Sequence, residues 1–147
     1  MQALQQRQRW MSVLAHSQPD QLRSHWQALS LNPSYQRLRA PEIGLTQLLG
    51  RMGATGRRFV LGDMTVTRAV VQLANGVQGY SYISGRDKDH AELCALIDAL
   101  LQQPASHELL QLQLIEPLAA LQQEQRQLRA RAVASSRVDF FTLVRGD

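Results

Sequence analysis

One short run of residues combines basic side chains with a turn and the expected start of a helix. Gly85-Arg86-Asp87-Lys88-Asp89-His90 lies where a predicted strand gives way to a predicted helix. Free backbone N–H groups at a helix start, together with Arg86, Lys88 and His90, could hold a phosphate or a carboxylate. Ordinary capping competes with this interpretation, because the aspartates of the run can cap the helix and complement its dipole. The run predicts either an anion contact or a plain helix start.

His90 and Cys94 are four residues apart and therefore share one face of the predicted helix, a spacing at which two side chains can bind one metal ion. Two ligands are too few for a site. The other histidines follow no ligand spacing: His16, His25 and His107. A buried thiol beside a hydrogen-bonded histidine is the favoured alternative, and the apolar neighbours of Cys94 would raise its pKa and disfavour a nucleophile. We expect neither a metal site nor a catalytic residue in this chain.

The last eleven residues, 137–147, are apolar and strand-prone for a chain end. Two of the chain's eight aromatic residues, Phe140 and Phe141, lie here, followed by Leu143 and Arg145. An exposed strand of this kind promotes aggregation unless it joins the protein's own sheet or is covered by a partner. We favour the partner, with these four side chains as docking contacts. The final Arg-Gly-Asp is taken as a chance match to an integrin tripeptide.

Familiar catalytic templates are absent from the sequence. It contains no GxxxxGK phosphate loop, no GxSxG elbow, no HExxH pair and no Rossmann fingerprint after a strand. The glycine-rich segment Gly50–Gly56 joins two predicted strands and lacks the lysine and the helix of a nucleotide loop. It predicts a hairpin connection instead.

Composition limits the class of protein. A chain of 147 residues fits one domain, and its single cysteine excludes an internal disulfide. The first residues lack the apolar stretch of a signal peptide, and no run is long enough to span a membrane, so we expect a soluble, cytoplasmic protein. Net charge is +6 over residues 1–60, −5 over 61–125 and +3 over 126–147, which favours complementary protein contacts. Scattered arginines and few aromatics argue against nucleic acid.

The sequence predicts that these residues are positioned by helices and strands of an α+β fold in a single domain, 1–147. Residues 1–32 predict a helical hairpin, with one helix over Leu4–His16 and a second from Pro19 to about Leu29. Residues 35–84 predict an antiparallel sheet of four or five strands, joined in part by a two-residue turn at Asn75-Gly76. The candidate strands are Tyr35–Ala40, Gly44–Met52, Arg58–Gly62, Met64–Ala74 and Val77–Ser84. The apolar residues of Met64–Ala74 change faces, which predicts either a bulge near Arg68 and Ala69 or burial on both faces.

Residues 87–134 predict two further helices. The first carries an apolar stripe at helical spacing and ends near Gln102 and Pro104: Leu93, Leu96, Ile97 and Leu100. The second runs from Ser106 to about Ala134, with a kink or break expected at Pro117 because proline removes a backbone donor and crowds the preceding turn. Its apolar positions are Leu110, Leu114, Leu118, Leu121 and Leu128. Residues 135–147 are expected to form an extended tail.

Five stretches together resemble the G subunit of the carbon-phosphorus lyase core complex. They occur in the family's order over nearly the whole chain: RQRWMSVLAHSQP, RMGATGRRFVLGDMTVTRA, GYSYISGRDK, GRDKDHAELCALIDALLQQ and SSRVDFFTLVRGD. The departures lie in the first residues and between about Ser106 and Ala134. This combination is far more specific than any single motif above.

The resemblance implies a role in phosphonate catabolism as one subunit of a larger assembly. Its expected partners are the H, I and J subunits of the core complex and an ATP-binding-cassette-like L subunit. With H, I and L, this subunit would be required when ribose triphosphate is transferred from MgATP to methylphosphonate and adenine is released. No catalytic residue and no cofactor are expected in this chain itself, and a single cysteine cannot hold the iron-sulfur cluster of the J subunit. A free-standing interaction module or nucleic-acid binder is the alternative.

Overall fold

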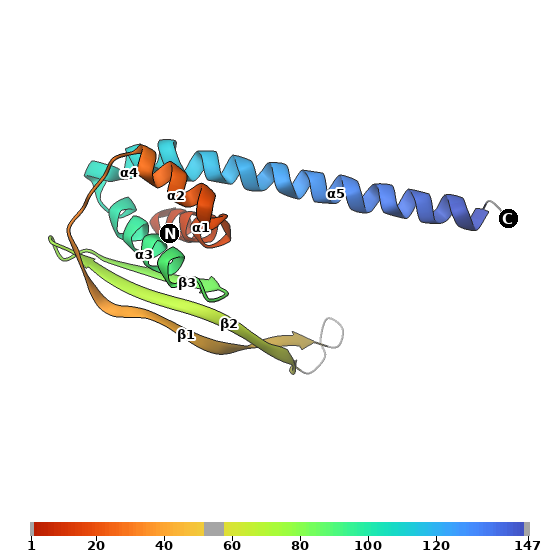
Figure 1. The fold of residues 1–147 in the computed structure, drawn as a ribbon, viewed down its shortest axis with the longest axis horizontal. Coiled ribbons are helices and arrows are strands. Elements are labelled where there is room, and N and C mark those ends of the chain that lie inside the picture. Colours follow the sequence, from red (N-terminus) through yellow and green to blue (C-terminus); the bar gives the residue numbers. More distant parts are fainter. Residues whose placement is uncertain (1, 52–57, 146–147) are drawn as a thin grey trace.

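The computed structural model of the chain describes residues 2–51 and 58–145. Two helices precede an antiparallel sheet, and a series of helices follows it (Figure 1). This arrangement confirms the predicted α+β class. The elements are α1 (Gln2–His16), α2 (Pro19–Ala28), β1 (Tyr35–Arg51), β2 (Arg58–Leu73), β3 (Gln78–Ser84), α3 (Lys88–Leu101), α4 (Pro104–Leu110), the π-helical turn η1 (Gln111–Ile115) and α5 (Glu116–Arg145).

The sheet of the described residues has three strands in the order β1-β2-β3, so the prediction of four or five strands is wrong. The breaks expected near Pro41 and after Gly62 fall inside β1 and β2. Both lie beside shifts in strand register, one between Arg39 and Glu42 and another at Leu48/Leu49. A bulge accommodates a proline or a glycine without ending a strand. The Gly50–Gly56 connection falls largely on residues 52–57, which lie outside the described ranges.

The irregularity expected in β2 lies instead in its partner strand. β1 carries the extra residues between Arg37 and Glu42, opposite the unbroken β2 segment from Arg68 to Val71, which also pairs with β3 without a shift. The β2–β3 hairpin is confirmed, but its loop has three residues, not two. The N–H of Gly76 donates to the Leu73 carbonyl at 2.9 Å, and Gly76 has a φ of +93°. This geometry is a type I turn followed by a glycine bulge.

Helix α3 forms the centre of the core. Its N-cap is Asp87, as the sequence predicts, and it packs along the face of the sheet formed by β2 and β3. Ten of its fourteen residues are buried, which exceeds the apolar stripe read from the sequence. The additional buried positions include Asp98, which has no solvent exposure.

The approach of α3 to β3 is closest at Gly79. A Cβ atom built there would lie 2.8 Å from the Ala99 side chain and would collide with the Ala95 carbonyl oxygen. Real Cβ atoms do not make such contacts, so only glycine permits this separation. Gly79 therefore brings the backbone of β3 within hydrogen-bonding reach of α3 side chains.

The two N-terminal helices follow each other as predicted, and both contact η1. Helix α1 contacts α3 and β3, and it buries Trp10, Val13 and Leu14. Helix α2 contacts η1 through its fully buried Leu22. Both helices therefore cover the same core from different sides.

The helical path continues from Pro104 to Arg145, and the kink or break expected at Pro117 is not confirmed. A π-helical turn directly precedes Pro117, and the Glu116 N–H donates to the Gln111 carbonyl. Pro117 then occupies the first turn of α5, where the missing N–H of a proline is tolerated. The predicted apolar stripe is buried at Leu110, Leu114 and Leu118.

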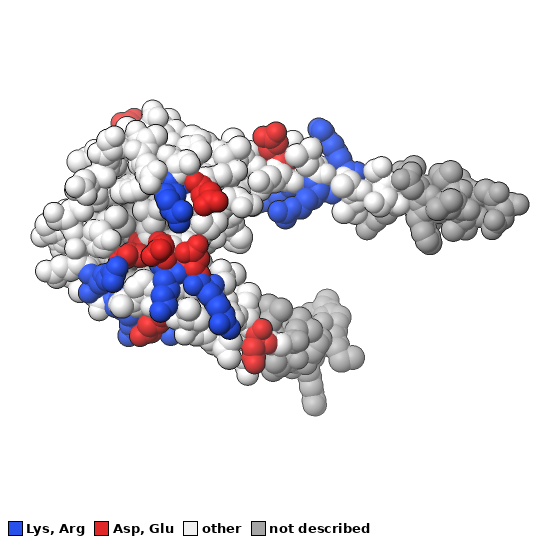
Figure 2. Space-filling view, in the orientation of Figure 1, with Lys and Arg blue, Asp and Glu red and all other residues white. Residues whose placement is uncertain are grey.

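The extended tail predicted for residues 135–147 is wrong, because α5 continues as a helix to Arg145. The segment contains no proline or glycine before Gly146, and extending an existing helix is less costly than starting one. Helix α5 leaves the body of the protein as a long arm, on the same side as the β1–β2 hairpin (Figure 1). Open space separates these two projections in Figure 2. No helix of the described ranges is long and apolar enough to cross a membrane.

Replacing Gly79 by alanine is expected to lower the free energy of unfolding by about 3 kcal/mol, because α3 and β3 must separate to admit the Cβ atom. Gly44→Ala is the matched control, since a Cβ atom at Gly44 meets nothing within 4 Å. Its effect should stay within about 0.5 kcal/mol. Urea denaturation of the two variants measures the difference. Equal stabilities would contradict the close packing of α3 on β3.

Candidate functional site

The structure does not bring Arg86, Lys88 and His90 together. The Asp87 carboxylate accepts the N–H of His90 at 2.9 Å and so caps α3. Arg86 and Lys88 are exposed, whereas the His90 side chain is buried beneath α1. The helix start is thus occupied by the chain's own carboxylate, as in the capping alternative.

The turn that leads into α3 is fixed by backbone contacts to β2. Gly85 has a φ of +98°, a conformation that favours glycine. Its N–H donates to the Thr65 carbonyl at 2.8 Å, and its carbonyl accepts the Thr67 hydroxyl at 2.7 Å. These bonds set the direction in which α3 begins.

His90 and Cys94 converge on one backbone carbonyl, that of Leu14 near the end of α1. The His90 Nε2 lies 3.1 Å from this oxygen and the Cys94 Sγ lies 3.5 Å from it, while the Ser17 hydroxyl donates to it at 2.6 Å. Since a carbonyl only accepts, Nε2 of His90 carries the proton. The last carbonyls of a helix lack intrahelical partners, and these donors satisfy one of them.

This arrangement stabilises the interior and offers no reactive group. Burial lowers the pKa of His90, although its hydrogen bond to Leu14 opposes the shift. Burial raises the pKa of the Cys94 thiol far above its ordinary value, which makes it a poor nucleophile. Within residues 2–51 and 58–145, no three His, Cys, Asp or Glu side chains are grouped so as to hold a metal ion.

Asp98 is the polar centre of the core, and the sequence analysis missed it. Its Oδ1 accepts from Trp10 Nε1 at 2.8 Å and from Arg7 Nε at 3.2 Å. Its Oδ2 accepts from Arg7 Nη2 and from the backbone N–H of Tyr80, both at 2.9 Å. These bonds raise the pKa of Arg7. An acidic residue between Ile97 and Ala99 in an apolar helix was the available signal, because such a carboxylate needs buried donors.

Asp98 has a structural role, because hydrogen bonds occupy both of its carboxylate oxygens. Arg7, Trp10 and Tyr80 surround both oxygens with donors, and Gln102 Nε2 lies 3.4 Å from Oδ2. Among the residues that the structure describes, no buried side-chain nitrogen or oxygen is without a partner. The polar interior therefore contains no unpaired group that could act on a substrate.

Ion pairs connect the basic N-terminal region to the acidic middle of the same chain. Arg7 pairs with Asp98 and Arg9 with Glu116, each at 2.9 Å. A third pair joins Arg37 to Glu92. Figure 2 shows acidic and basic side chains side by side over the start of α3 and the adjoining strands. At these positions the oppositely charged regions of the sequence pair with each other inside the chain, so their charges do not serve contacts with a partner alone.

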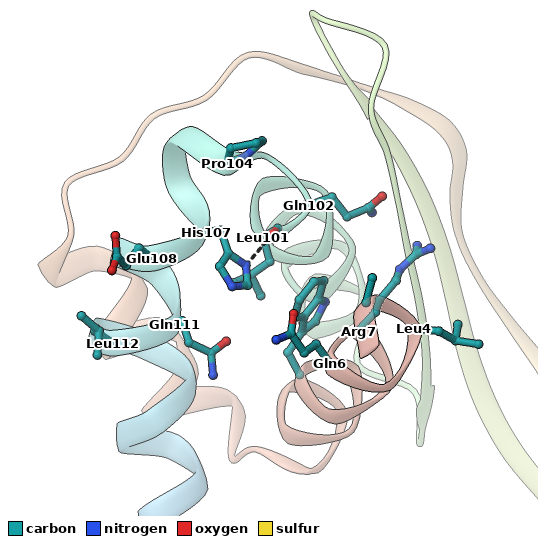
Figure 3. Close-up of a pocket in the computed structure, with 12 residues that line it drawn as sticks. Leu4, Gln6, Arg7, Leu101, Gln102, Pro104, His107, Glu108, Gln111 and Leu112 are labelled. Carbon is teal, nitrogen blue, oxygen red and sulfur yellow. Dashed lines mark hydrogen bonds between the residues drawn. The ribbon is translucent and has the colours of Figure 1, made fainter. Parts of the chain in front are cut away.

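An open apolar groove of about 990 Å³ lies between α1 and α4 (Figure 3). Trp10 and Leu101 line it together with His107, whose Nδ1 lies 2.9 Å from the Leu101 carbonyl. Leu4 and Leu112 also line the groove and are 60% and 62% exposed. Large exposed leucines beside an apolar groove are typical of a protein-docking surface.

The described residues form an α+β fold whose buried polar side chains are all paired. The family model described as phosphonate metabolism protein PhnG matches residues 5–146. The chain is also 39% identical over 142 residues to a protein of Rhizobium meliloti named alpha-D-ribose 1-methylphosphonate 5-triphosphate synthase subunit PhnG. That alignment covers 97% of this chain and 90% of the relative. The chain belongs to the PhnG family of phosphonate metabolism proteins, which confirms the resemblance read from the sequence.

The stability of the folded chain should fall as the pH drops below 6.5, the ordinary pKa of histidine. Burial lowers the pKa of His90, so in this range the unfolded chain binds a proton that the folded chain excludes. The loss continues down to the lowered pKa of the folded state and then levels off. In His90→Gln this part of the pH dependence should disappear, whereas His16→Gln, at an exposed site, should retain it. Thermal unfolding across this pH range measures it, and identical profiles for all three proteins would refute the assignment.

Proposed function

We propose that this chain is an accessory subunit of alpha-D-ribose 1-methylphosphonate 5-triphosphate synthase. The observation that carries the proposal is the 39% identity, over 97% of the chain, to a relative named as a subunit of that enzyme. The paired polar interior supports an accessory role, since every buried side-chain nitrogen and oxygen of the described residues has a hydrogen-bond partner. The reaction is then performed at a site that other subunits complete.

In this proposal the partners are the H, I and J subunits of the carbon-phosphorus lyase core complex and the L subunit. The chain acts with H, I and L while ribose triphosphate passes from MgATP to methylphosphonate and adenine leaves. It holds no cofactor of its own, and MgATP is a substrate of the complex.

The surface of the chain supports a role inside an assembly. Its accessible surface is 10,259 Å², whereas a compact monomer of 16.5 kDa exposes about 7,500 Å². The excess of roughly 2,700 Å² is larger than the share of one partner in an ordinary interface, about 800 Å². Leu45 on the hairpin and Leu128 on α5 are 71% and 56% exposed, and both lie on the projecting parts. Such surface is suited to burial by partner subunits.

The docking role of Phe140, Phe141, Leu143 and Arg145 belongs to this proposal. It rests on their sequence, since their side chains lie outside what the structure describes. The backbone of α5 carries them on the projecting arm. They are therefore placed away from the core that stabilises the chain.

Omitting this chain from cells that express the H, I, J and L subunits should abolish adenine release from MgATP and methylphosphonate. The tagged chain should also co-purify with its partners. Phe140→Ala combined with Phe141→Ala should lose co-purification while the helical circular dichroism of the chain is retained. Turnover unaffected by omission would contradict the accessory role, and unchanged co-purification of the double variant would contradict docking through the phenylalanines.

Arg86 and Lys88 remain candidates for contact with an anion at a shared active site, because both are exposed beside the start of α3. His90 faces the interior and does not join them. Arg86→Ala is expected to leave the complex assembled and to slow adenine release by about tenfold, the loss of one charged hydrogen bond. Asp20→Ala, at an exposed site on α2, is the control. An unchanged rate in assembled Arg86→Ala complex would exclude the contact.

A further inference from the structure

One face of the sheet carries no helix. All helices lie on the opposite side, where α3 packs (Figure 1). Side chains of β3 alternate between the two faces: Ser81 is buried and donates its hydroxyl to the Ala91 carbonyl of α3 at 2.6 Å. Its neighbours Tyr80 and Tyr82 therefore point to the open face, where they are 42% and 51% exposed.

Arginines and aliphatic side chains accompany the two tyrosines. Arg68 pairs across the strands with Tyr82, and Val70 pairs with Tyr80, so these four side chains share the open face. Arg39 of β1 lies opposite Val70. The neighbouring Leu38 is 47% exposed, and it lines with these five residues an open groove of about 570 Å³ that reaches Met11 of α1 at the edge of the sheet. We call this surface the tyrosine–arginine face.

The charges of this face are largely uncompensated. Arg39 makes no ion pair with any residue in the described ranges. Arg68 has one carboxylate nearby, that of Glu42, at 4.0 Å, and both side chains are about half exposed. Arg7 and Arg37, in contrast, are held by carboxylates of α3. A ligand of this face would thus meet two guanidinium groups and two aromatic rings, with the Glu42 carboxylate beside Arg68.

We propose that the tyrosine–arginine face docks on an acidic surface segment of a partner subunit, with carboxylates on Arg39 and Arg68 and an apolar side chain between the tyrosines. The inference rests on the proposed function, which places the chain in an assembly. Tyrosine and arginine are the side chains enriched at the centres of protein interfaces, and the arginine fork matches a carboxylate. A small molecule is a poorer fit, because the face is open and both arginines are largely in solvent.

The test measures the affinity of the purified chain for the complex of the remaining subunits, by biolayer interferometry at low and high salt. Arg39→Glu combined with Arg68→Glu should weaken association by about tenfold or more at low salt and remove most of the salt dependence. Tyr82→Ser should weaken it at both salt concentrations. Glu42→Gln should tighten it, because the carboxylate beside Arg68 is removed. Arg23→Glu on α2, which reverses an equally exposed arginine, should have no effect.

The outcomes separate the docking face from the proposed function. If the wild-type chain and the double variant bind the other subunits with equal affinity, the docking proposal for this face is overturned and the accessory role is left intact. Failure of the wild-type chain to bind the other subunits would overturn both. The double variant could instead retain subunit binding and lose binding to a single-stranded oligonucleotide or lose self-association. Either result would assign the face to another occupant and refute the proposal.

Discussion

The Asp98 carboxylate, which has no access to solvent, is the constraint on which the rest of the structure depends. Burying a carboxylate is costly unless hydrogen bonds replace its water, and here Arg7 and Trp10 of α1 and the N–H of Tyr80 in β3 do so. The three elements α1, β3 and α3 must therefore meet at one point. Gly79 makes the meeting sterically possible, since any side chain there would collide with α3. Removing Arg7 would leave the buried carboxylate without its ion-pair partner.

The same contacts also cover the free edge of the sheet at β3. β3 is an edge strand, and a free edge exposes backbone N–H and carbonyl groups that attract other strands. Asp98 accepts the N–H of Tyr80, and Gln102 donates to the carbonyl of Gln78 at 2.8 Å. Side chains of α3 and of its C-cap residue, Gln102, thus take the place of a fourth strand along this part of the edge.

Sequence patterns predicted the features that depend on neighbouring residues, such as helix caps and turns. They did not predict the features that depend on contacts between distant segments. The helix start at Asp87 and the hairpin at Asn75-Gly76 follow from side-chain capping and glycine conformation, and both were predicted, although the hairpin loop is one residue longer than expected. Pro41 was taken as the end of a strand because a bulge depends on the neighbouring strand. Residues 135–145 were expected to be extended because their β-branched and aromatic residues favour strands, whereas the preceding helix extends through them. Asp98 was missed because its donors are about 90 positions away in the sequence.

The contacts that stabilise the core and the face proposed for docking therefore meet at one residue, Tyr80. Tyr80 belongs to both: its backbone N–H is fixed by Asp98, and its ring lies on the open face of the sheet. Arg7 binds Asp98, and its Cζ also lies 5.5 Å from the centre of the Tyr80 ring, an arrangement typical of a cation–π contact. The Asp98–Arg7 pair thus contacts both the backbone and the ring of Tyr80. A surface fixed in this way loses little conformational entropy when a partner covers it, so the buried charge that holds the fold together also preorganises the face available for docking.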